Sequence, residues 1–327
     1  MVLIDLVVGS APGLEASTWP LPPAAPAAPG RSRSYRCPKM TFVERLAQFA
    51  ERARFADLSE AAREQLQIRI LDALGCALGA EPILRVQAQV GELDGEGRCT
   101  LIGGGRAPPD RAALLNGALV RYLDFNDSYL APGETCHPSD NLGTVFAAAE
   151  YASASGRDLM TALALSYQVQ CRFSDEAPVR ARGFDHTTQG SYAVAAGVSR
   201  ALGLDRDRTA AAIALCGTAF NALRVTRTGR LSQWKGLAYP MAAACCVNAV
   251  FLAKHGVTGL LEVVEGKKGF REAIAGPFDI DWQREDLERV RDTILKRYNA
   301  RSIRRRPSPR PCGCAGRAPL YRPTSPG

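Results

Sequence analysis

The sequence lacks the residue spacings by which proteins usually hold metals and redox cofactors. It has only three histidines, and no HExxH, HxxxH or paired CxxC motif, so no conventional zinc site is indicated. The ten cysteines follow neither an iron–sulfur nor a disulfide spacing. The glycines at 103–105 lack the lysine and the spacing of a phosphate-binding or dinucleotide-binding loop. We therefore predict that the protein uses no metal and no cofactor.

From the sequence, we also expect no hydrophobic segment long enough to span a membrane. No run is apolar enough over the length that a membrane-spanning helix needs. The first residues have neither the basic start nor the uninterrupted apolar core of a secretory signal. Most cysteines of residues 40–300 lie in apolar helical stretches such as MAAACCVNAVFLA (241–253), which is typical of buried thiols in a reducing compartment. We predict a cytoplasmic protein without a membrane segment.

The central part of the chain has little net charge. The formal charge of the whole sequence is +8, but residues 301–327 contain seven arginines and no acidic residue. Residues 1–39 add a small positive excess, so residues 40–300 are close to neutral. A neutral body offers no electrostatic surface for a phosphate backbone. We predict no nucleic-acid partner.

The two ends differ in composition from the residues between them. Residues 1–39 include PLPPAAPAAPGRSRS, which is typical of a disordered N-terminal extension. Met40 opens the first helical pattern, and we interpret it as the original start of the protein. Residues 301–327 form a basic tail rich in Arg and Pro. Its composition resembles a GC-rich gene read out of frame, and a solvated basic tail is the alternative.

Helical periodicity runs through almost all of residues 41–265. In the segment 57–80, Asp57 followed by Glu60 predicts a capping box. The same segment has four apolar residues at i, i+4 spacing, which favours one buried helix face: Leu66, Ile70, Leu74 and Leu78. A helical pattern opens at Met40 with MTFVERLAQFAERA, and further helices are expected at 110–123, 143–155, 158–173, 188–202, 206–218, 237–255 and 257–265.

These patterns predict a mainly α fold. Helices do not alternate with strands, which argues against a doubly wound α/β sheet. The pattern changes only after residue 276, where PFDIDW and DTILKRYNA are β-prone. The predicted organisation is a large all-helical domain at 40–276, followed at 277–300 by only the start of an α+β domain.

The loop at 124–143, DFNDSYLAPGETCHPSDNLG, contains the densest set of polar residues. It lies between apolar helices, where polar groups are costly unless they pair with one another or with a ligand. His137 can move a proton near neutral pH, and Asp124 or Asp127 could orient it or act as a base. The alternative is that Asp127 or Ser128 caps the loop and His137 makes a local hydrogen bond.

A second histidine stands at the start of a predicted helix, in GFDHTTQG (183–190). The amides of a helix N-terminus attract anions, so His186 is a candidate for anion binding. A capping role for Asp185 or Thr187 is compatible with this interpretation. The third histidine, His255, lies at a helix C-terminus, where the helix dipole favours a partly positive imidazole. We predict that it is structural.

The segment NALRVTRTGRLSQWKGLAYP (221–240) is a basic loop between apolar helices. It contains Arg224, Arg227, Arg230 and Lys235. Cations entering a helical core are costly unless they meet carboxylates. Considered alone, this segment is slightly better interpreted as an exposed basic loop.

Four strings taken together resemble the MmgE/PrpD family, which includes 2-methylcitrate dehydratase and cis-aconitate decarboxylase. They are NGALVRYLDFNDSYL…HPSDNLG, GFDHTTQGSYA, NALRVTRTGRLSQWKGLAYP and EGKKGFREAIAGPF, and the resemblance runs in order from about Met40 to Ala300. It implies a mostly helical large domain and a smaller α+β lid domain, of which 277–300 would be the beginning. It also implies a homodimer and metal-free chemistry on a small tricarboxylate substrate.

The resemblance extends to individual residues. It implies that Asp124, His137 and Lys235 are catalytic. It implies that the substrate is bound by Ser128, His186, Lys296 and Arg227. Dehydrating a hydroxylated tricarboxylate requires a base for a carbon-bound proton, an acid for the leaving hydroxyl, and cations for the carboxylates. These residue types supply all three.

The sequence departs from the family after Ala300. Family members continue there with an acid–x–His–Ser type of segment, whereas this chain continues with RSI and has no histidine after His255. We interpret the change as a frameshift, which sequencing the locus would test by revealing a lid in another frame. The expected function is that of a cofactor-independent 2-methylcitrate dehydratase of propionate metabolism. The alternatives are an inactive truncated fragment, or a related decarboxylase or epimerase of tricarboxylate-like acids.

Overall fold

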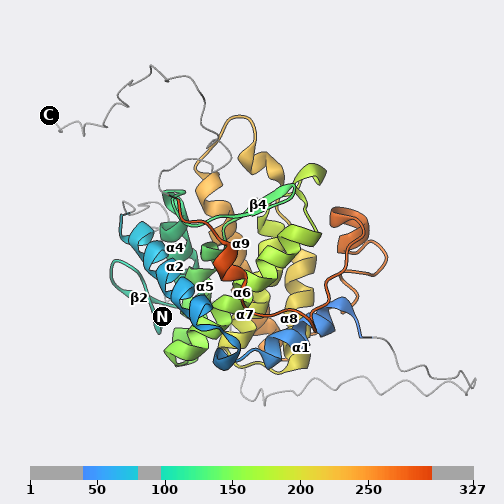
Figure 1. The fold of residues 1–327 in the computed structure, drawn as a ribbon, viewed down its shortest axis with the longest axis horizontal. Coiled ribbons are helices and arrows are strands. Elements are labelled where there is room, and N and C mark those ends of the chain that lie inside the picture. Colours follow the sequence, from blue (N-terminus) through green and yellow to red (C-terminus); the bar gives the residue numbers. More distant parts are fainter. Residues whose placement is uncertain (1–39, 80–96, 297–327) are drawn as a thin grey trace, which may run out of the picture. The chain divides into compact units, whose positions relative to one another are not determined.

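The computed structural model describes residues 40–79 and 97–296 (Figure 1). The predicted extension at 1–39, the basic tail at 301–327, the frameshift after Ala300 and the end of the DTILKRYNA segment lie outside the described residues. The account that follows concerns the described ranges only.

The predicted mainly α fold is confirmed. The α-helices are α1 (Phe42–Arg52), α2 (Glu60–Gly79), α4 (Pro109–Tyr122), α5 (Leu142–Tyr151), α6 (Gly156–Glu176), α7 (Thr187–Ala201), α8 (Arg206–Ala219) and α9 (Trp234–Lys254). The strands are short and pair as β1 (Cys99–Thr100) with β2 (Arg106–Ala107), and β3 (Tyr129–Ala131) with β4 (Glu134–Cys136). Short helical turns are η1 (Phe55–Asp57), η2 (Pro138–Asn141), η3 (Arg180–Arg182), η4 (Arg224–Arg227), η5 (Arg271–Ala275) and η6 (Arg289–Asp292).

Small residues allow the central helices to approach closely. Helix α4 packs against α5 and α9, and α7 packs against α6, α8 and α9 (Figure 1). A Cβ atom on Gly143 in α5 would lie 2.4 Å from the backbone nitrogen of Gly117 in α4, a separation that carbon and nitrogen atoms cannot adopt. The two backbones are therefore in direct contact. This agrees with the alanine-rich and glycine-rich pattern, which fills the core with small side chains.

Helix α2 begins differently from our prediction. Its first free amides are capped by Ser59, whose Oγ accepts from the Ala62 amide at 3.0 Å. Asp57 belongs to the preceding turn and accepts from the Arg54 amide at 2.9 Å, so the predicted capping box at Asp57 is wrong. The buried face also differs from the predicted stripe, because Leu78 is 73% exposed and the long polar side chain of Arg69 is buried.

Two further predictions about elements are wrong. No helix forms at 257–265, where the chain makes turns. The loop at 124–143 is not a plain connection, because it contains the β3–β4 hairpin and the turn η2. Strands of three residues are too short to produce a recognisable alternation of polar and apolar residues.

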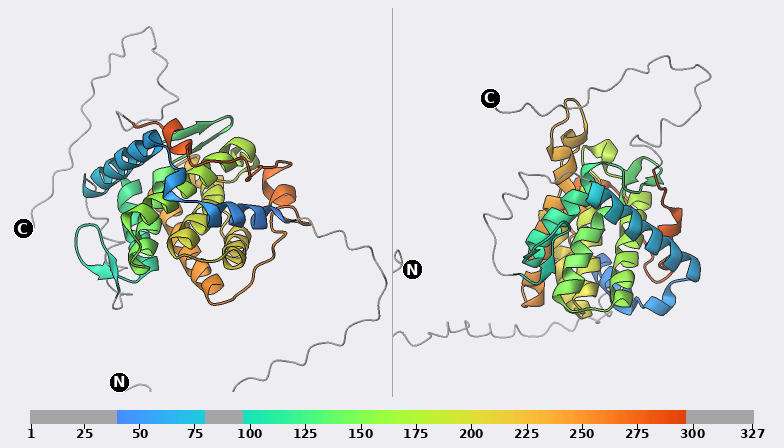
Figure 2. Two further views of the ribbon diagram at one scale, coloured as in Figure 1. Left: turned by 60° about the horizontal axis from the view of Figure 1, so that its bottom comes forward. Right: turned by 90° about the vertical axis from the view of Figure 1, so that its left-hand side faces the viewer.

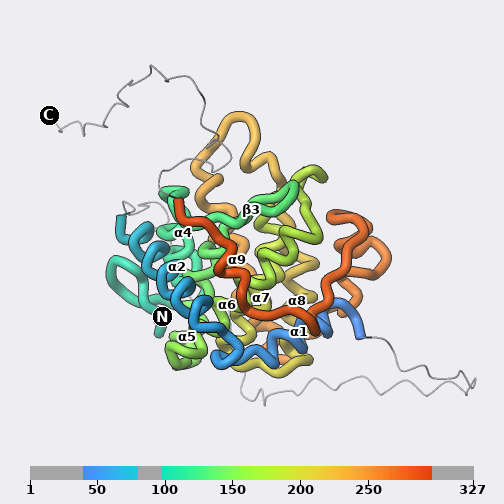
Figure 3. Tube along the Cα trace, in the orientation of Figure 1, coloured from blue at the N-terminus to red at the C-terminus, as the bar shows by residue number. Residues whose placement is uncertain are grey.

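The segment from 277 to 296 packs on the helices as a strap. Its predicted strand at PFDIDW does not form, and Ile294 makes only an isolated antiparallel bridge with Ser128. Trp282 is buried against Phe42 and Phe49 of α1, with ring centroids 5.9 and 5.6 Å away. Figure 3 shows this segment in red crossing the helices, and Figure 2 shows η6 beside α2 and the β3–β4 hairpin. The assignment of 277–300 to a separate domain stays a prediction.

Helix α9 corrects our expectation that no segment could span a membrane. Within the described residues, Trp234–Lys254 is long and apolar enough by length and composition, and 56% of its most apolar window is buried. The helix packs against α4, α7 and α8, and core helices of this kind meet the same criterion.

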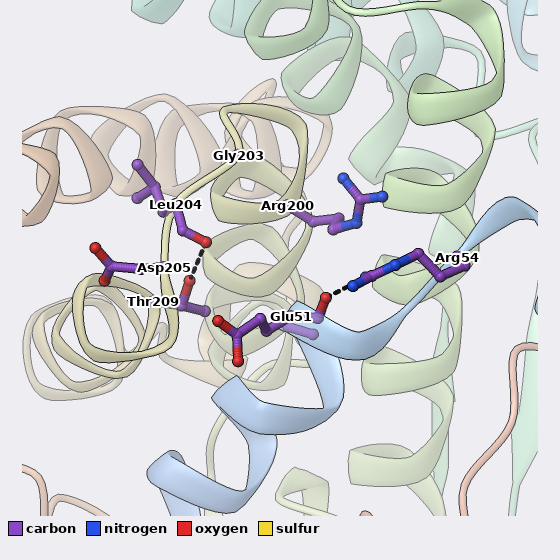
Figure 4. A pocket seen from close by; sticks show the side chains of 8 residues that line it. Glu51, Arg54, Arg200, Gly203, Leu204, Asp205 and Thr209 are labelled. Carbon is purple, nitrogen blue, oxygen red and sulfur yellow. Dashed lines mark hydrogen bonds between the residues drawn. The ribbon is translucent and has the colours of Figure 1, made fainter.

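A polar pocket of about 340 Å³ lies between α1, α7 and α8 (Figure 4). Arg54 and Arg200 both enter it, and both donate to the carbonyl of Ala53 at the end of α1, at 3.0 and 3.1 Å. Cations at a helix C-terminus interact favourably with its dipole. The pocket is therefore a capping arrangement, and it contains none of the predicted site residues.

Candidate functional site

Asp124 is the centre of a cluster of cations at the end of α4. It follows the last turn of that helix and adopts a positive φ of 51°, a conformation in which aspartate is tolerated better than most residues. Its carboxylate accepts from Arg121 at 2.5 Å, from Lys235 at 3.0 Å and from Lys296 at 3.3 Å. Three positive side chains thus share one carboxylate.

The two lysines reach Asp124 from distant parts of the sequence. Lys235 lies in the first turn of α9. Lys296 lies near the end of the strap and also donates to the backbone carbonyl of Asp124 at 2.9 Å. The bridge just before it fixes the strap, because Ser128 and Ile294 exchange two backbone hydrogen bonds of 2.9 and 2.7 Å.

The strap is held from its other side by a buried arginine of α2. Arg69 donates from Nε and Nη2 to the hydroxyl and the carbonyl of Thr293, both at 2.7 Å. Its guanidinium also lies 3.9 Å from the buried carboxylate of Asp127. Arg69 therefore joins the strap to the loop that carries His137.

The charges around Asp124 determine its protonation. Burial raises the pKa of Asp124, but Arg121 and Lys296 outweigh burial and hold that pKa well below its usual range. Burial lowers the pKa of Lys296, and Arg121 adds to this effect against the attraction of Asp124. A carboxylate held in this way suits the binding of cations better than the acceptance of a proton. The proton-transfer role that we expected for Asp124 does not fit this pairing.

His137 is held in the tautomer of a base. Its Nδ1 lies 2.7 Å from the backbone carbonyl of Asp127 and 3.2 Å from the hydroxyl of Ser128. A carbonyl only accepts hydrogen bonds, so Nδ1 carries the hydrogen and Nε2 keeps its lone pair. Burial lowers the pKa of His137 well below its ordinary range, and the charges of Arg121 and Lys296 lower it further. The local hydrogen bond that we considered as an alternative is present, and it leaves the lone pair of Nε2 as the acceptor of the ring.

Asp127 fixes the loop that carries His137. Its carboxylate accepts from the Ser139 amide at 3.1 Å, from the Ser139 hydroxyl at 2.7 Å and from the Tyr167 hydroxyl at 2.9 Å. Burial raises the pKa of Asp127. The capping role that we considered for Asp127 is therefore the one the structure shows.

His186 has the opposite surroundings. Its Nδ1 lies 3.2 Å from Asp185, and its Nε2 lies 3.8 Å from Asp140. Burial lowers the pKa of His186, but the two carboxylates outweigh burial and raise it above the ordinary value. The rings of His137 and His186 meet edge to face with their centroids 5.5 Å apart. Two neighbouring histidines are thus set toward different protonation states.

The basic segment 221–240 is not an exposed loop at every position. The side chain of Arg227 is only 4% exposed and donates to Asp185 from Nε at 2.9 Å. It also donates from Nη1 to the carbonyl of Lys235 at 2.8 Å. The alternative in which cations meet carboxylates is therefore correct for Arg227, whose guanidinium is occupied by protein groups.

The structure brings most of the predicted site residues together. Asp124 contacts both Lys235 and Lys296. Ser128 contacts His137, and His186 adjoins His137. Arg227 is linked to His186 through Asp185, which contacts both residues. His255 lies at the end of α9 as the C-cap residue. Within residues 40–79 and 97–296, no three His, Cys, Asp or Glu side chains are grouped to hold a metal ion.

Sequence reasoning missed Arg121 and Asp140, and it considered Asp185 only as a helix cap, a contact that it does make with Thr187. Arg121, Asp140 and Asp185 are all buried and all pair with predicted site residues. Asp140 and Asp185 stand within three positions of a site histidine, which is a signal that could have indicated them. A single arginine in the apolar run LLNGALVRYL (114–123) could have indicated Arg121, because a buried charge requires a partner.

Comparison with known proteins identifies the class to which this fold and site belong. The MmgE/PrpD N-terminal domain matches residues 44–283. The chain belongs to the MmgE/PrpD family.

Among its relatives are enzymes named 2-methylcitrate dehydratase. The mitochondrial 2-methylcitrate dehydratase of Yarrowia lipolytica is 29% identical over 258 residues, which are 72% of this chain and 49% of the relative. The 2-methylcitrate dehydratase of Escherichia coli K12 is 31% identical over 222 residues, which are 62% of this chain and 45% of the relative. That of Cupriavidus necator is 32% identical over 202 residues, 57% and 41% of the two chains. The chain spans about half the length of these relatives.

Proposed function

We propose that this protein is a cofactor-independent hydro-lyase that removes water from a tricarboxylate of the 2-methylcitrate type. The observation that carries the proposal is the group of Arg121, Lys235 and Lys296 around one carboxylate, next to a neutral His137. Because three cations share one anion, the cluster keeps an excess of positive charge that attracts a polyanion. The names of the relatives support the same class of reaction.

The elimination requires that a proton and a hydroxyl leave from adjacent carbons. His137 accepts the carbon-bound proton on Nε2, and the electron pair of that C–H bond forms the new double bond as the hydroxyl departs. Lys235 is the more exposed of the two lysines, with 30% of its side chain accessible against 5% for Lys296. It donates the proton that turns the leaving hydroxyl into water. The products are water and the unsaturated tricarboxylate, and the step leaves His137 protonated and Lys235 as a neutral amine. Transfer of one proton from His137 to Lys235 through solvent restores both groups without any other reactant.

The remaining groups anchor the substrate carboxylates. Lys296 and Arg121 stabilise the negative charge that develops beside the abstracted proton. His186 contributes the charge of an imidazolium ion, and Ser128 contributes a hydroxyl next to His137. In the free protein, Asp124 holds the two lysines where the carboxylates of the substrate would arrive.

Incubation of the purified chain with 2-methylcitrate tests the proposal. The expected result is a rise in ultraviolet absorbance from the unsaturated product. His137→Asn should reduce the rate by about 10²–10⁴, the usual contribution of a general base. His255→Asn is the matched control, because His255 lies at the far end of α9, and it should keep the wild-type rate. Unchanged turnover in His137→Asn would remove His137 from the mechanism.

The alternative is a non-catalytic member of the family. The observation that favours it is that Arg121, Lys235 and Lys296 are already paired with a carboxylate of the protein, Asp124. No product from 2-methylcitrate, together with no loss of cis-aconitate by decarboxylation, would support this alternative. A product from cis-aconitate alone would favour a decarboxylase. The homodimer and the cytoplasmic location are parts of the same proposal.

A further inference from the structure

Asp185 serves three elements of the site at once. It is fully buried, and its Oδ2 accepts from Arg227 Nε at 2.9 Å and from Arg224 Nη1 at 3.2 Å. Its Oδ1 lies 3.2 Å from His186 Nδ1 and accepts from the hydroxyl of Thr187 at 2.8 Å. A helix-capping aspartate needs only the contact with Thr187. The two arginines and the histidine go beyond that requirement.

The contacts of Asp185 continue to the cation cluster. Arg227 links it to the backbone of Lys235, whose ammonium group holds Asp124. The other side of His186 faces Asp140, and the Oδ2 atom of Asp140 lies 3.6 Å from Arg121 Nε.

Arg121 in turn binds Asp124, so the contacts form a closed ring that includes His186. The ring runs through Asp124, Arg121, Asp140, His186, Asp185, Arg227 and Lys235.

We propose that Asp185 is a positioning residue that keeps His186 as an imidazolium ion and, through Arg227, fixes the turn of α9 that carries Lys235. Its catalytic consequence rests on the proposed function, since His186 and Lys235 contact the substrate only if that function holds. The protonation and the position of these groups are properties of the free protein and can be measured without substrate.

The charged and aromatic neighbours of His186 all enter this inference. Asp185 and Asp140 face its two nitrogens, and Arg227 opposes them from the η4 turn. The ring of Tyr239 stacks on His186 with centroids 6.0 Å apart, and His137 meets its edge. Burial lowers the pKa of His186 while the two carboxylates raise it, and Arg227 lowers it again. Asp185 is nearer to the ring than Asp140, so its charge raises the pKa of His186 more than the charge of Asp140 does.

Nuclear magnetic resonance titration of the histidines tests the first half of the proposal. The chain has only three histidines, so His137→Asn and His255→Asn assign the three ring signals. Asp185→Asn keeps the size of the side chain and one acceptor but removes the charge. The expected result is at least a tenfold loss of proton affinity at His186, about one pKa unit. A His186 signal that titrates within about twofold of wild type in Asp185→Asn would overturn the proposal, since one pKa unit corresponds to tenfold.

The matched control separates the charge from helix capping. Asp158 also accepts a hydroxyl hydrogen bond at a helix start, from Ser155 at 2.6 Å, but it lies outside the ring. Asp158→Asn should lower the melting temperature while leaving the titration of His186 unchanged. If Asp185→Asn does not fold, Asp140→Asn takes its place, with the same expected direction and the same contradicting result.

Arg227→Lys tests the second half. The lysine keeps a positive charge near Asp185 but loses the hydrogen bond to the Lys235 carbonyl. Acetic anhydride labelling followed by mass spectrometry should show Lys235 reacting at least about threefold faster relative to Lys254, as expected for the loss of one hydrogen bond. An unchanged ratio would overturn the link to Lys235. Neither readout needs turnover, so inactivity toward 2-methylcitrate would count against the proposed function alone.

Discussion

His137 and His186 have opposite electrostatic surroundings although their rings are neighbours. His137 faces a backbone carbonyl and two cations, whereas His186 faces two carboxylates. The free protein thereby has a neutral imidazole next to a positively charged one. In the proposed reaction, preorganisation of this kind would remove the need to rearrange charges.

The raised pKa of His186 makes the stability of the protein depend on pH. The folded state binds this proton more tightly than the unfolded state does, so the stabilisation is complete below the unfolded pKa, near 6.5, and is lost as pH rises through the folded pKa. We expect the difference in unfolding free energy between wild type and His186→Asn to be largest near pH 6. It should shrink by up to about 1.4 kcal/mol per pH unit in the window above 6.5.

Urea denaturation at several pH values between 6 and 9 measures this difference. His255→Asn serves as the control for the loss of a histidine away from the site. A difference between wild type and His186→Asn that stays constant or grows with rising pH would contradict the prediction.

At the scale of single residues, the sequence allowed the groups with obvious chemistry to be predicted. The polar loop, His137 and the lysines followed from residue types and from the family resemblance. Arg121, Asp140 and the ion pairs of Asp185 did not, because a buried charge is recognised by its partner. Which residue becomes the partner depends on contacts between elements far apart in the sequence, as with Asp185 and Arg227.

At the scale of elements, the packing of α4 on α5 is a tight constraint near the site. Gly143→Ala would place a methyl group against the Gly117 backbone, directly after the loop that carries His137. Overpacking of a core typically costs about 1–3 kcal/mol, and we expect a loss of at least that size. Gly75→Ala, in α2, is the matched control, because a Cβ there meets no atom within 4 Å.

Thermal and chemical unfolding measure both variants. Gly75→Ala should stabilise the protein by about 0.5–1 kcal/mol, the difference in helix propensity between the two residues. A neutral Gly143→Ala would show that the two helices can separate without cost, contrary to the contact described here.

Long helices could be predicted from the sequence, whereas very short strands could not. Helices such as α4, α6 and α7 are long enough to be recognised from their content of small and apolar residues, since most of their positions are buried. The β3–β4 hairpin has strands of three residues, and its position depends on packing against α6. The buried Arg69 in α2 interrupts the apolar stripe because it serves the strap, and nothing in the local pattern reveals that partner.

At the scale of the whole molecule, one surface groove is apolar. A cavity of about 650 Å³ lies between the end of α8, the η4 turn and the start of α9. Its lining includes Val225, Trp234 and Met241, with 69, 46 and 39% of their surface exposed. Exposed apolar patches of this kind mark surfaces that bind other proteins. The proposed homodimer offers a second copy of the chain for this role.

Light scattering of the purified chain should therefore give twice the chain mass of 35.1 kDa. Met241→Asp should shift the mass to that of one chain, because burying a new charge in an apolar contact is costly. Leu252→Asp is the control, since Leu252 lies on the same helix, is 52% exposed and does not line the groove. A single-chain mass for the wild type would contradict the prediction.

The contact between Lys296 and Asp124 joins positions 172 residues apart. The residues of the cation cluster are therefore synthesised at different times during translation. The ribosome releases Asp124 and Arg121 together, so the aspartate first meets only its local cation. Lys235 is synthesised later, with α9. Lys296 is synthesised last, with the strap that Arg69 binds through Thr293. The helices α1 to α9 are therefore synthesised before the cluster has all of its cations. The cluster can be completed only after residue 296 has been synthesised.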